Sequence, residues 1–152
     1  MSVAGTSSVA ADAPDAEIRR QVEKIVEGIE AKDLEALRPL YAPDVVSFDI
    51  EPPLQHVGID AKLRNWAKVF TVFEEVTYEI RDLVVTVGGD IAFGHAFGRL
   101  GGVLNNGAAT GGMWVRITFC FRRIEGRWSV VHDQVSVPFD IATGSGVADL
   151  AP

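Results

Sequence analysis

The sequence predicts an α+β domain, in which three N-terminal helices pack on a curved, mostly antiparallel β-sheet and enclose a pocket in a cone-shaped roll. Three observations lead to this expectation. Apolar residues in the first half recur at three- and four-residue spacings, which is typical of amphipathic helices. From Val76 onward the spacing changes to two, which is typical of strands. Short turns bearing glycine separate these strands, so consecutive strands should pair antiparallel.

The composition is that of one globular domain. The chain has 152 residues, of which 47% are hydrophobic and 23% charged. This is enough for a core without a metal or a disulfide. The net charge of −7 disfavours binding to nucleic acid or to an anionic membrane. No apolar run reaches the roughly 20 residues of a membrane span. The single cysteine, Cys120, fits a reducing, cytoplasmic setting.

Three segments are expected. Residues 1–14 are predicted to be a disordered leader, because they lack the basic start and apolar stretch of a secretion signal. Residues 15–140 form the domain. Residues 141–152 are small and rich in glycine, and they are predicted to be a tail without a pattern of its own.

The helices are predicted from their apolar stripes and their caps. The first begins near Asp15, the second is short and capped by Asp33, and the third begins at Gly58. The stripe of the first helix consists of Ile18, Val22, Ile25, Val26 and Ile29. The stripe of the third consists of Leu63, Trp66, Ala67, Phe70 and Phe73. Between the second and third helices, residues 45–49 are predicted to be a short strand.

The long strands follow one another. They are expected over residues 76–87, 91–100 and 113–123, and a final strand opens at Trp128 and closes near Pro138. Strict alternation along the final strand would place its even-numbered residues on one face, namely Trp128, Val130, His132, Gln134 and Ser136. Asp133 would then point to the opposite face.

The pairing of the last two strands depends on their turn. A three-residue loop ending at Gly126 would pair Thr118 with His132, and a two-residue loop would put Asp133 opposite Thr118. We favour the three-residue loop, because a glycine in the left-handed position is common there.

Three residues are candidates for catalysis. Asp49, at a strand end near aromatic residues, could act as a general base, or it could simply accept hydrogen bonds from loop N–H groups. His132 could shuttle a proton or be a buried structural histidine. Arg116 would join His132 in a polar cluster that suits a carboxylate, enolate or carbonyl ligand, or that braces the sheet or a dimer interface.

Further side chains are expected to line the pocket. They are Trp66, Phe70, His95, Phe97, Trp114, Thr118 and Gln134. His95 alternates with phenylalanines, which is more typical of a core residue than of a ligand. Three widely spaced histidines do not indicate a zinc site, so no metal is expected, and no cofactor is implied.

Three stretches resemble the nuclear transport factor 2 superfamily, in its SnoaL-like branch with ketosteroid isomerase relatives. They read A-K-D-L-E-A-L-R-P-L-Y-A-P-D-V-V-S-F-D, P-P-L-Q-H-V-G and R-I-T-F-C-F-R-R-I-E-G-R-W-S-V-V-H-D-Q-V-S-V-P. The resemblance covers roughly residues 16 to 140 and implies a cone-shaped pocket and a dimer formed through the sheet. Since the superfamily includes isomerases, cyclases, hydrolases and adaptors, it does not by itself assign a function.

The resemblance also bears on individual residues. Asp49, in V-S-F-D, matches the proton-shuttling base of ketosteroid isomerases, but Ile25 and Thr118 stand where their oxyanion-binding Tyr and Asp would be. Arg116 matches the arginine of related epoxide hydrolases, whose aspartate is replaced by Thr118. His132-Asp133-Gln134 lacks the second histidine of an H-x-H motif. Each departure disfavours the corresponding mechanism.

Two functions are therefore expected from the sequence. The first is binding of an apolar, oxygenated small molecule in the cone, with cofactor-independent acid–base catalysis of the isomerase, cyclase or lyase type. The second is a non-catalytic domain that forms a homodimer and keeps only a vestigial pocket.

Overall fold

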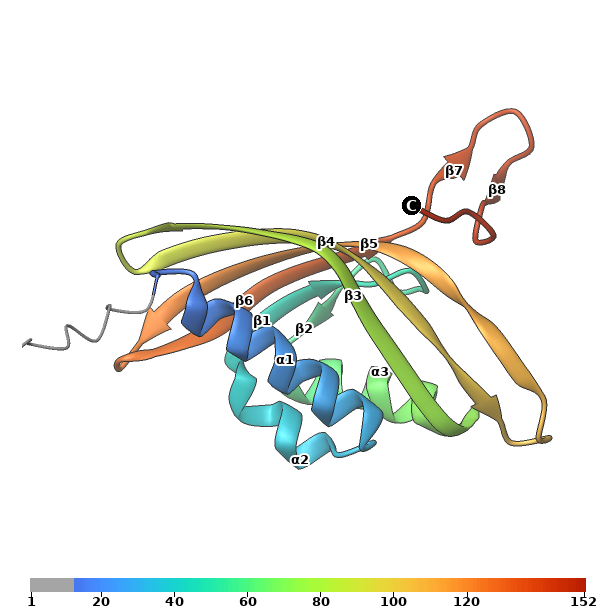
Figure 1. Ribbon diagram of the computed structural model, residues 1–152, viewed down its shortest axis with the longest axis horizontal. Helices are drawn as coiled ribbons and strands as arrows, with labels where there is room; N and C mark the ends of the chain where they lie inside the picture. The colour runs from blue at the N-terminus through green and yellow to red at the C-terminus, as the bar shows by residue number, and fades with distance from the viewer. Residues whose placement is uncertain (1–12) are drawn as a thin grey trace, which may run out of the picture.

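The computed structural model describes residues 13–152, so the predicted disordered leader lies almost entirely outside the described residues. Figure 1 shows the helices gathered on one side of a long, curved sheet. The helices are α1 (Ala16–Glu30), α2 (Leu34–Leu37), the 3₁₀ turn η1 (Arg38–Leu40) and α3 (Ile59–Phe70). The strands are β1 (Tyr41–Phe48), β2 (His56–Val57), β3 (Phe73–Gly88), β4 (Ile91–Leu104), β5 (Ala109–Ile124), β6 (Arg127–Ser136), β7 (Phe139–Asp140) and β8 (Ser145–Gly146).

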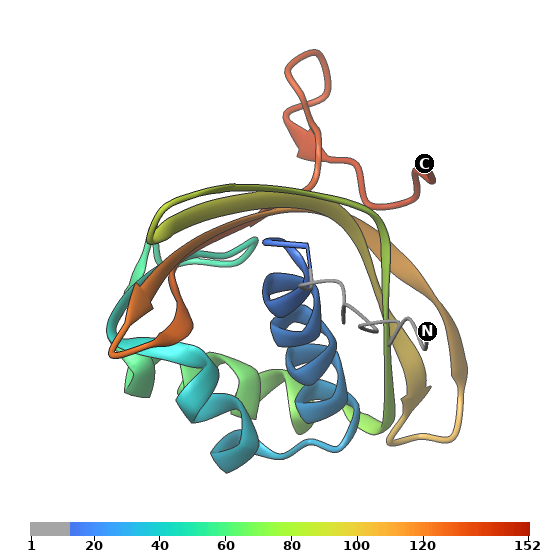
Figure 2. The same cartoon turned by 60° about the vertical axis from the view of Figure 1, so that its left-hand side comes forward.

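Six strands form one open sheet in the order β2-β1-β6-β5-β4-β3. All neighbours pair antiparallel except β1 and β6, which are parallel. The sheet arches over α1 and α3, and no helix of residues 13–152 covers its opposite face, called here the outer face (Figure 2). The predicted α+β class and the mostly antiparallel, curved sheet are therefore confirmed, although the sheet is not closed.

The helices form for the reasons that the sequence indicates. The side chain of Asp33 accepts a hydrogen bond from the Ala36 N–H at 3.0 Å and so caps α2. Asp15 precedes α1 but does not cap it with its side chain; its carboxylate instead binds Arg19 at 2.7 Å. The apolar stripe of α1 faces the sheet, where Ile18, Val22, Ile25 and Ile29 are buried.

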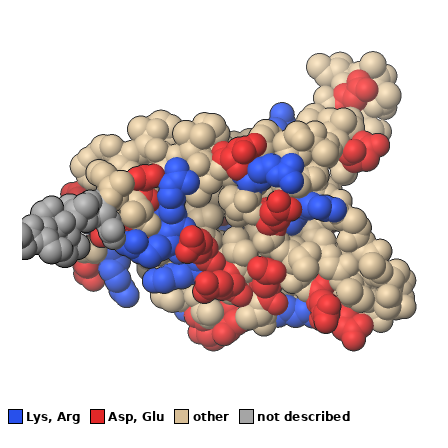
Figure 3. All heavy atoms as spheres, viewed as in Figure 1, with Lys and Arg blue, Asp and Glu red and all other residues tan. Residues whose placement is uncertain are grey.

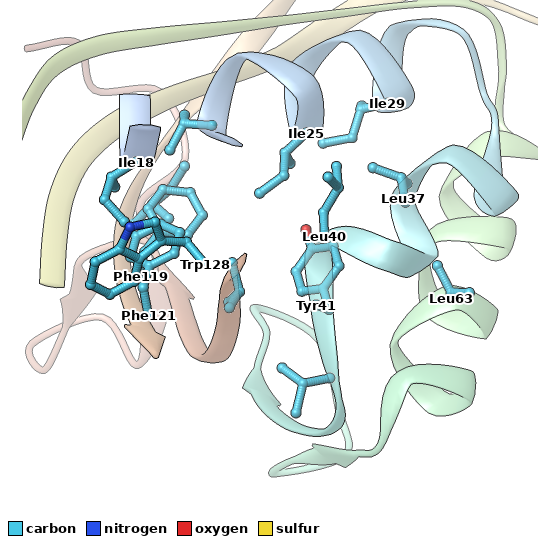
Figure 4. Packing of buried hydrophobic residues seen from close by; sticks show 14 of the residues in the cluster. Ile18, Ile25, Ile29, Leu37, Leu40, Tyr41, Leu63, Phe119, Phe121 and Trp128 are labelled. Carbon is cyan, nitrogen blue, oxygen red and sulfur yellow. The ribbon is translucent and has the colours of Figure 1, made fainter. Parts of the chain in front are cut away.

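The core fills the space between the helices and the inner face of the sheet. Figure 4 shows α1 side chains above those of α2, β1 and the last strands. The largest fully buried side chain is Phe121 on β5. The small residues of β4 allow neighbours to approach closely. A Cβ atom on Gly98, for example, would lie 2.5 Å from Ile117 Cδ1 and 2.8 Å from the Tyr78 hydroxyl oxygen.

A β-bulge in β6 changes the predicted register. The turn is a two-residue loop, Glu125-Gly126, with positive φ at both residues, so the predicted three-residue loop is wrong. Cys120 then pairs with His132 while Phe121 pairs with Val130, which leaves Val131 as an extra residue. Thr118 consequently lies opposite Gln134, a pairing that neither of the two predicted loops would give.

The bulge also reverses the faces of β6. Trp128 and Val130 are buried on the inner face, as predicted by alternation. After the extra residue, Asp133 points inward, and His132 and Gln134 point to the outer face. A second bulge, at Asp82 with φ of 57°, shifts β3 against β4 in the same way.

The C-terminal segment contains two short strands. Strands β7 and β8 pair in a small hairpin that stands away from the domain on the side of the outer face (Figures 1 and 2). Over residues 13–152 no helix is both long enough and apolar enough to cross a membrane.

Candidate functional site

Two adjoining cavities lie between the helices and the inner face of the sheet. The mouth cavity has a volume of about 70 Å³ and the deep cavity about 20 Å³. Trp66, Tyr78 and Val135 line both. Larger hollows of about 320, 540 and 360 Å³ lie along α1 and the edge of the sheet. We place the site in the cone despite its smaller volume, because its apolar walls enclose carboxylates and tyrosines.

Asp49 lies in the wall of the mouth cavity, just beyond the end of β1. One carboxylate oxygen accepts a hydrogen bond from the Ile50 N–H at 2.7 Å, and the other accepts one from the Asn65 side chain on α3. Asp49 therefore accepts a hydrogen bond from a loop N–H group, and it also borders the cavity. The hydrogen bond from Asn65 on α3 orients this carboxylate.

A buried ion pair connects the deep cavity to α3. Lys62 Nζ lies 2.7 Å from Asp133 Oδ2 and 3.2 Å from Ser47 Oγ, and the Ser47 hydroxyl donates a hydrogen bond to Asp133. The residues are only 5%, 3% and 1% exposed, in the order Lys62, Asp133 and Ser47. The Lys62 ammonium also lies 4.9 Å from the centre of the Tyr41 ring. Asp133 lines the deep cavity, and the Lys62 ammonium compensates the charge of its carboxylate.

Two tyrosines contribute hydroxyl groups to the cone. Tyr41 lines the deep cavity and Tyr78 lines both cavities. Burial raises the pKa of Tyr41 well above its usual value, and the negative charge of Asp133 adds to the shift. Burial also raises the pKa of Tyr78, with smaller contributions from Tyr41 and Asp133. Both hydroxyls therefore stay protonated at neutral pH and can donate a hydrogen bond.

Most residues predicted for the pocket lie elsewhere. Trp66 lines both cavities, and Phe70 is buried behind it, with ring centres 5.6 Å apart. The others lie on strand positions that face outward, because the pleat and the bulge in β6 turn them away from the helices. These residues are His95, Phe97, Trp114, Arg116, Thr118, His132 and Gln134.

The outward residues still form a connected surface. Between β4 and β5, Phe97 pairs with Arg116 and His95 pairs with Thr118. Between β5 and β6, Thr118 pairs with Gln134. Arg116 Nε donates a hydrogen bond to Ser136 Oγ at 3.2 Å. Arg116, Thr118 and Gln134 therefore lie at neighbouring positions, but His132 pairs with Cys120 and not with Thr118, and all four lie on the outer face, apart from the cone cavities.

His132 is held by two contacts on this outer side. Its Nδ1 lies 2.6 Å from the Val46 carbonyl oxygen, so the Nδ1–H donates to β1. Its ring meets the Phe48 ring edge-on, with centres 4.7 Å apart. Both contacts connect β6 to β1, where the sheet has its single parallel pairing.

We expect His132→Ala to lower the free energy of unfolding by about 1–3 kcal/mol, because it removes the hydrogen bond to β1 and the ring contact. The melting temperature should fall by several degrees. Thermal unfolding followed by circular dichroism measures this. Gln134→Ala, an exposed change on the same face and strand, is the control and should change little. Equal melting of the parent and His132→Ala would contradict a structural role.

Several site residues were not predicted from the sequence. They are Tyr41, Ser47, Lys62, Asn65, Tyr78 and Asp133. One signal was available: the adjacent apolar pair Val130-Val131 interrupts the alternation of the final strand, which is compatible with a bulge. For Lys62, the pattern of α3 gives no indication, since a lysine at the edge of an apolar stripe is normally solvated.

No group of three or more His, Cys, Asp or Glu side chains within residues 13–152 is arranged to hold a metal ion. Cys120, on the outer face, has a free thiol, and burial raises its pKa.

Comparison with known families agrees with this architecture. The family model of the SnoaL-like domain matches residues 18–140, and the chain belongs to this family. A search of curated proteins finds no match to the sequence.

Solved structures show the same fold. An NTF2-like protein of unknown function from Pseudomonas putida KT2440 is 29% identical, with a TM-score of 0.83 over 93% of this chain and 99% of that chain. A ketosteroid isomerase-like protein from Erwinia carotovora atroseptica SCRI1043 is 21% identical, with a TM-score of 0.69 over 83% and 97%. An NTF2-like superfamily protein from Salmonella enterica serovar Typhimurium LT2 is 18% identical, with a TM-score of 0.73 over 86% and 95%.

Proposed function

We propose that this protein binds a small, apolar molecule bearing a carbonyl or hydroxyl group in the cone and catalyses a proton transfer on it. One observation carries the proposal. The mouth cavity has predominantly apolar walls, yet both Asp49 and Tyr78 line it. A base and a neutral hydrogen-bond donor facing one apolar cavity are the parts that acid–base catalysis requires.

The roles follow from the chemistry of the two groups. Asp49 takes a proton from the carbon next to a carbonyl, and the electron pair moves onto the carbonyl oxygen, which becomes an enolate. The Tyr78 hydroxyl donates a hydrogen bond to that oxygen. Return of the proton from Asp49 to the same or another carbon regenerates the carboxylate. Asn65 orients Asp49 throughout, since its amide donates to the carboxylate.

The fold family supports this proposal at the level of the reaction type. One similar structure is named a ketosteroid isomerase-like protein, and isomerisation by proton transfer needs no cofactor. His132 and Arg116 were expected to assist Asp49. Because both side chains lie on the outer face, Tyr78 replaces them as the oxyanion donor in this proposal.

A second candidate function is a non-catalytic domain with a vestigial pocket. The cavity volume favours it, because about 70 Å³ is well below the roughly 300 Å³ of a typical ligand site. Trp66 lines both cavities, stacked on Phe70 and edge-on to Tyr78. Only a ligand of a few heavy atoms, or a shift of the mouth residues, is compatible with binding.

Isotope exchange separates the two candidates. The probe is cyclopentanone in deuterated water. We expect the parent protein to accelerate the exchange of hydrogen for deuterium at the carbon next to the carbonyl. Proton NMR measures the rate of this exchange. Asp49→Asn should slow this by about 100-fold or more, and Tyr78→Phe by about 100-fold. Glu51→Gln, an exposed carboxylate two residues from Asp49, is the matched control and should keep the parent rate.

Thermal shift with phenol as a second probe tests binding alone. Exchange at the uncatalysed rate together with no shift would overturn the catalytic proposal and leave the vestigial pocket. A shift without exchange would also overturn it, in favour of a binding protein. Exchange that survives Asp49→Asn would remove Asp49 from the mechanism.

We also propose that the protein is a cytoplasmic homodimer formed through the outer sheet face. The uncovered face supports this, because it exposes Phe48, Val84, Ile91 and Phe93. The free thiol of Cys120 suits a reducing setting. Sedimentation velocity over a dilution series measures the association, and a monomer at every concentration would contradict it.

A further inference from the structure

We propose that the C-terminal arm, residues 139–152, packs on the outer sheet face of a second copy of this chain, so that each copy gives its arm to the other. This rests on the homodimer proposed above and names the segment that completes its interface. The occupant follows from four features of the molecule: the shape of the arm, its exposed side chains, the outer face and the charges on both.

The arm is held in shape but covers none of its own large side chains. The Val147 N–H donates to the Pro138 carbonyl at 2.7 Å, and the Gly144 N–H donates to the Asp140 carbonyl at 2.8 Å. Nevertheless Phe139, Ile141 and Leu150 are 64%, 90% and 53% exposed. A hairpin this short is at best marginally stable by itself, and its exposed apolar residues indicate a missing partner.

The arm points away from its own domain. Figures 1 and 2 show β7 and β8 rising from the end of β6 on the side of the outer face, without lying on the sheet. Pro138, whose φ is restricted, directs the chain at this point. The arm is therefore available to another molecule that approaches the same face.

The outer face offers an apolar surface of matching kind. Its exposed apolar residues come from three neighbouring strands: Val84 on β3, Ile91 and Phe93 on β4, and the half-buried Cys120 on β5. No helix within residues 13–152 covers them (Figure 2).

The charges of the arm and the face are opposite. The arm has two acidic residues, Asp140 and Asp149, and no lysine or arginine; in Figure 3 it is tan and red. The outward positions of β3, β4 and β5 carry four arginines and two glutamates, so this part of the sheet is net positive in a chain whose net charge is −7. These residues are Arg81, Arg99, Arg116, Arg122, Glu75 and Glu79. An acidic, apolar arm therefore complements this face in both respects.

A two-fold axis would place the arm of each copy on the outer face of the other. In a two-fold dimer the same patch serves on each subunit, so an arm that leaves one face can reach the equivalent face of the other. The chain needs no other partner to cover either surface.

Two variants and one control test the proposal by sedimentation velocity over a dilution series. Phe139→Asp with Ile141→Asp places acid in the arm, and Phe93→Asp places it on the face. We expect each to raise the dimer dissociation constant by at least about tenfold. Leu54→Asp, at a residue 96% exposed in the loop before β2, is the control and should leave the constant unchanged.

A cross-linking experiment locates the arm directly. A photoreactive phenylalanine analogue at position 141 is introduced into full-length chains, and ¹⁵N-labelled and unlabelled chains are mixed before illumination. We expect cross-linked peptides that join labelled to unlabelled chains and map to β4 or β5. Cross-links within one chain only, or to the helices of the partner, would overturn the arm proposal.

The outcomes distinguish this inference from the proposals that it extends. A parent that is monomeric at every concentration overturns both the homodimer and the arm. A dimer whose dissociation constant is unchanged by the arm substitutions, without cross-links between chains, overturns the arm alone. Neither result affects the isotope-exchange test of Asp49.

Discussion

Lys62→Met is expected to lower the free energy of unfolding by about 3–5 kcal/mol, because it leaves the carboxylate of Asp133 buried without its counter-charge. Asp133→Asn should cost a similar amount, since it leaves the ammonium of Lys62 uncompensated. Ser47→Ala removes only a hydroxyl that donates to Asp133, so its cost should be smaller, about 1–3 kcal/mol. Urea unfolding followed by tryptophan fluorescence measures all three.

The double substitution decides whether the pair acts as a unit. Lys62→Met with Asp133→Leu removes both charges together, and we expect a free energy of unfolding near that of the parent or above it. The control is Lys68→Met, an exposed lysine two turns further along α3, which should change stability by less than about 1 kcal/mol. A double variant as unstable as either single one would contradict the coupling.

These unfolding free energies would show whether the ion pair has a structural role. The pair lies at the bottom of the cone, where it joins α3 to β1 and β6, and a large stability cost would assign it a structural role. The exchange rate of cyclopentanone in the double variant would then show whether Asp133 also takes part in chemistry, because only the mouth group Asp49 would remain.

Alkaline pH is expected to unfold the protein through its two tyrosines, which are the only ones in the sequence. Their pKa values are raised in the folded state, so the folded protein keeps protons that the unfolded chain releases above about pH 10. Their contribution to stability is therefore fully present below pH 10 and is lost as the pH rises further. The loss is about 1.4 kcal/mol per pH unit for each tyrosine, or about 5 kcal/mol for both by about pH 12.

Phenolate absorbance in the ultraviolet measures this directly. We expect neither tyrosine to ionise in the native protein near pH 10, and both to ionise together when the chain unfolds. Tyr41→Phe should remove half of the pH dependence of the unfolding free energy, as should Tyr78→Phe, and each variant serves as the control of the other. Reversible ionisation of one tyrosine near pH 10, without unfolding, would show that its hydroxyl is not buried.

The two tyrosines also connect stability with the proposed chemistry. Burial keeps the Tyr78 hydroxyl neutral, as a donor to an oxyanion requires, and Asp49 lines the same cavity. An apolar environment that makes the protein sensitive to alkali is therefore the same environment in which the hydrogen bond to an enolate would be strongest.

Much of the fold can be predicted from the sequence because it depends on local patterns. The stripe of α1, the cap at Asp33 and the change of period at Val76, three residues into β3, each indicate an element directly. The sequence also predicts Asp49 at the end of a short strand near aromatic residues, and the structure places it in the wall of the mouth cavity.

The faces of the sheet were decided only by the tertiary structure. One extra residue at Val131 turns Asp133 into the cone and His132 out of it, so a sequence pattern with a period of two predicts the wrong side for every later position. Lys62 is a similar case, because its burial depends on a counter-charge that lies 71 residues further along the chain. The sequence by itself determined which elements form, through short-range periodicity and capping. The packing of α3 against β1 and β6 determined which polar groups meet in the cone, because that depends on contacts between distant residues.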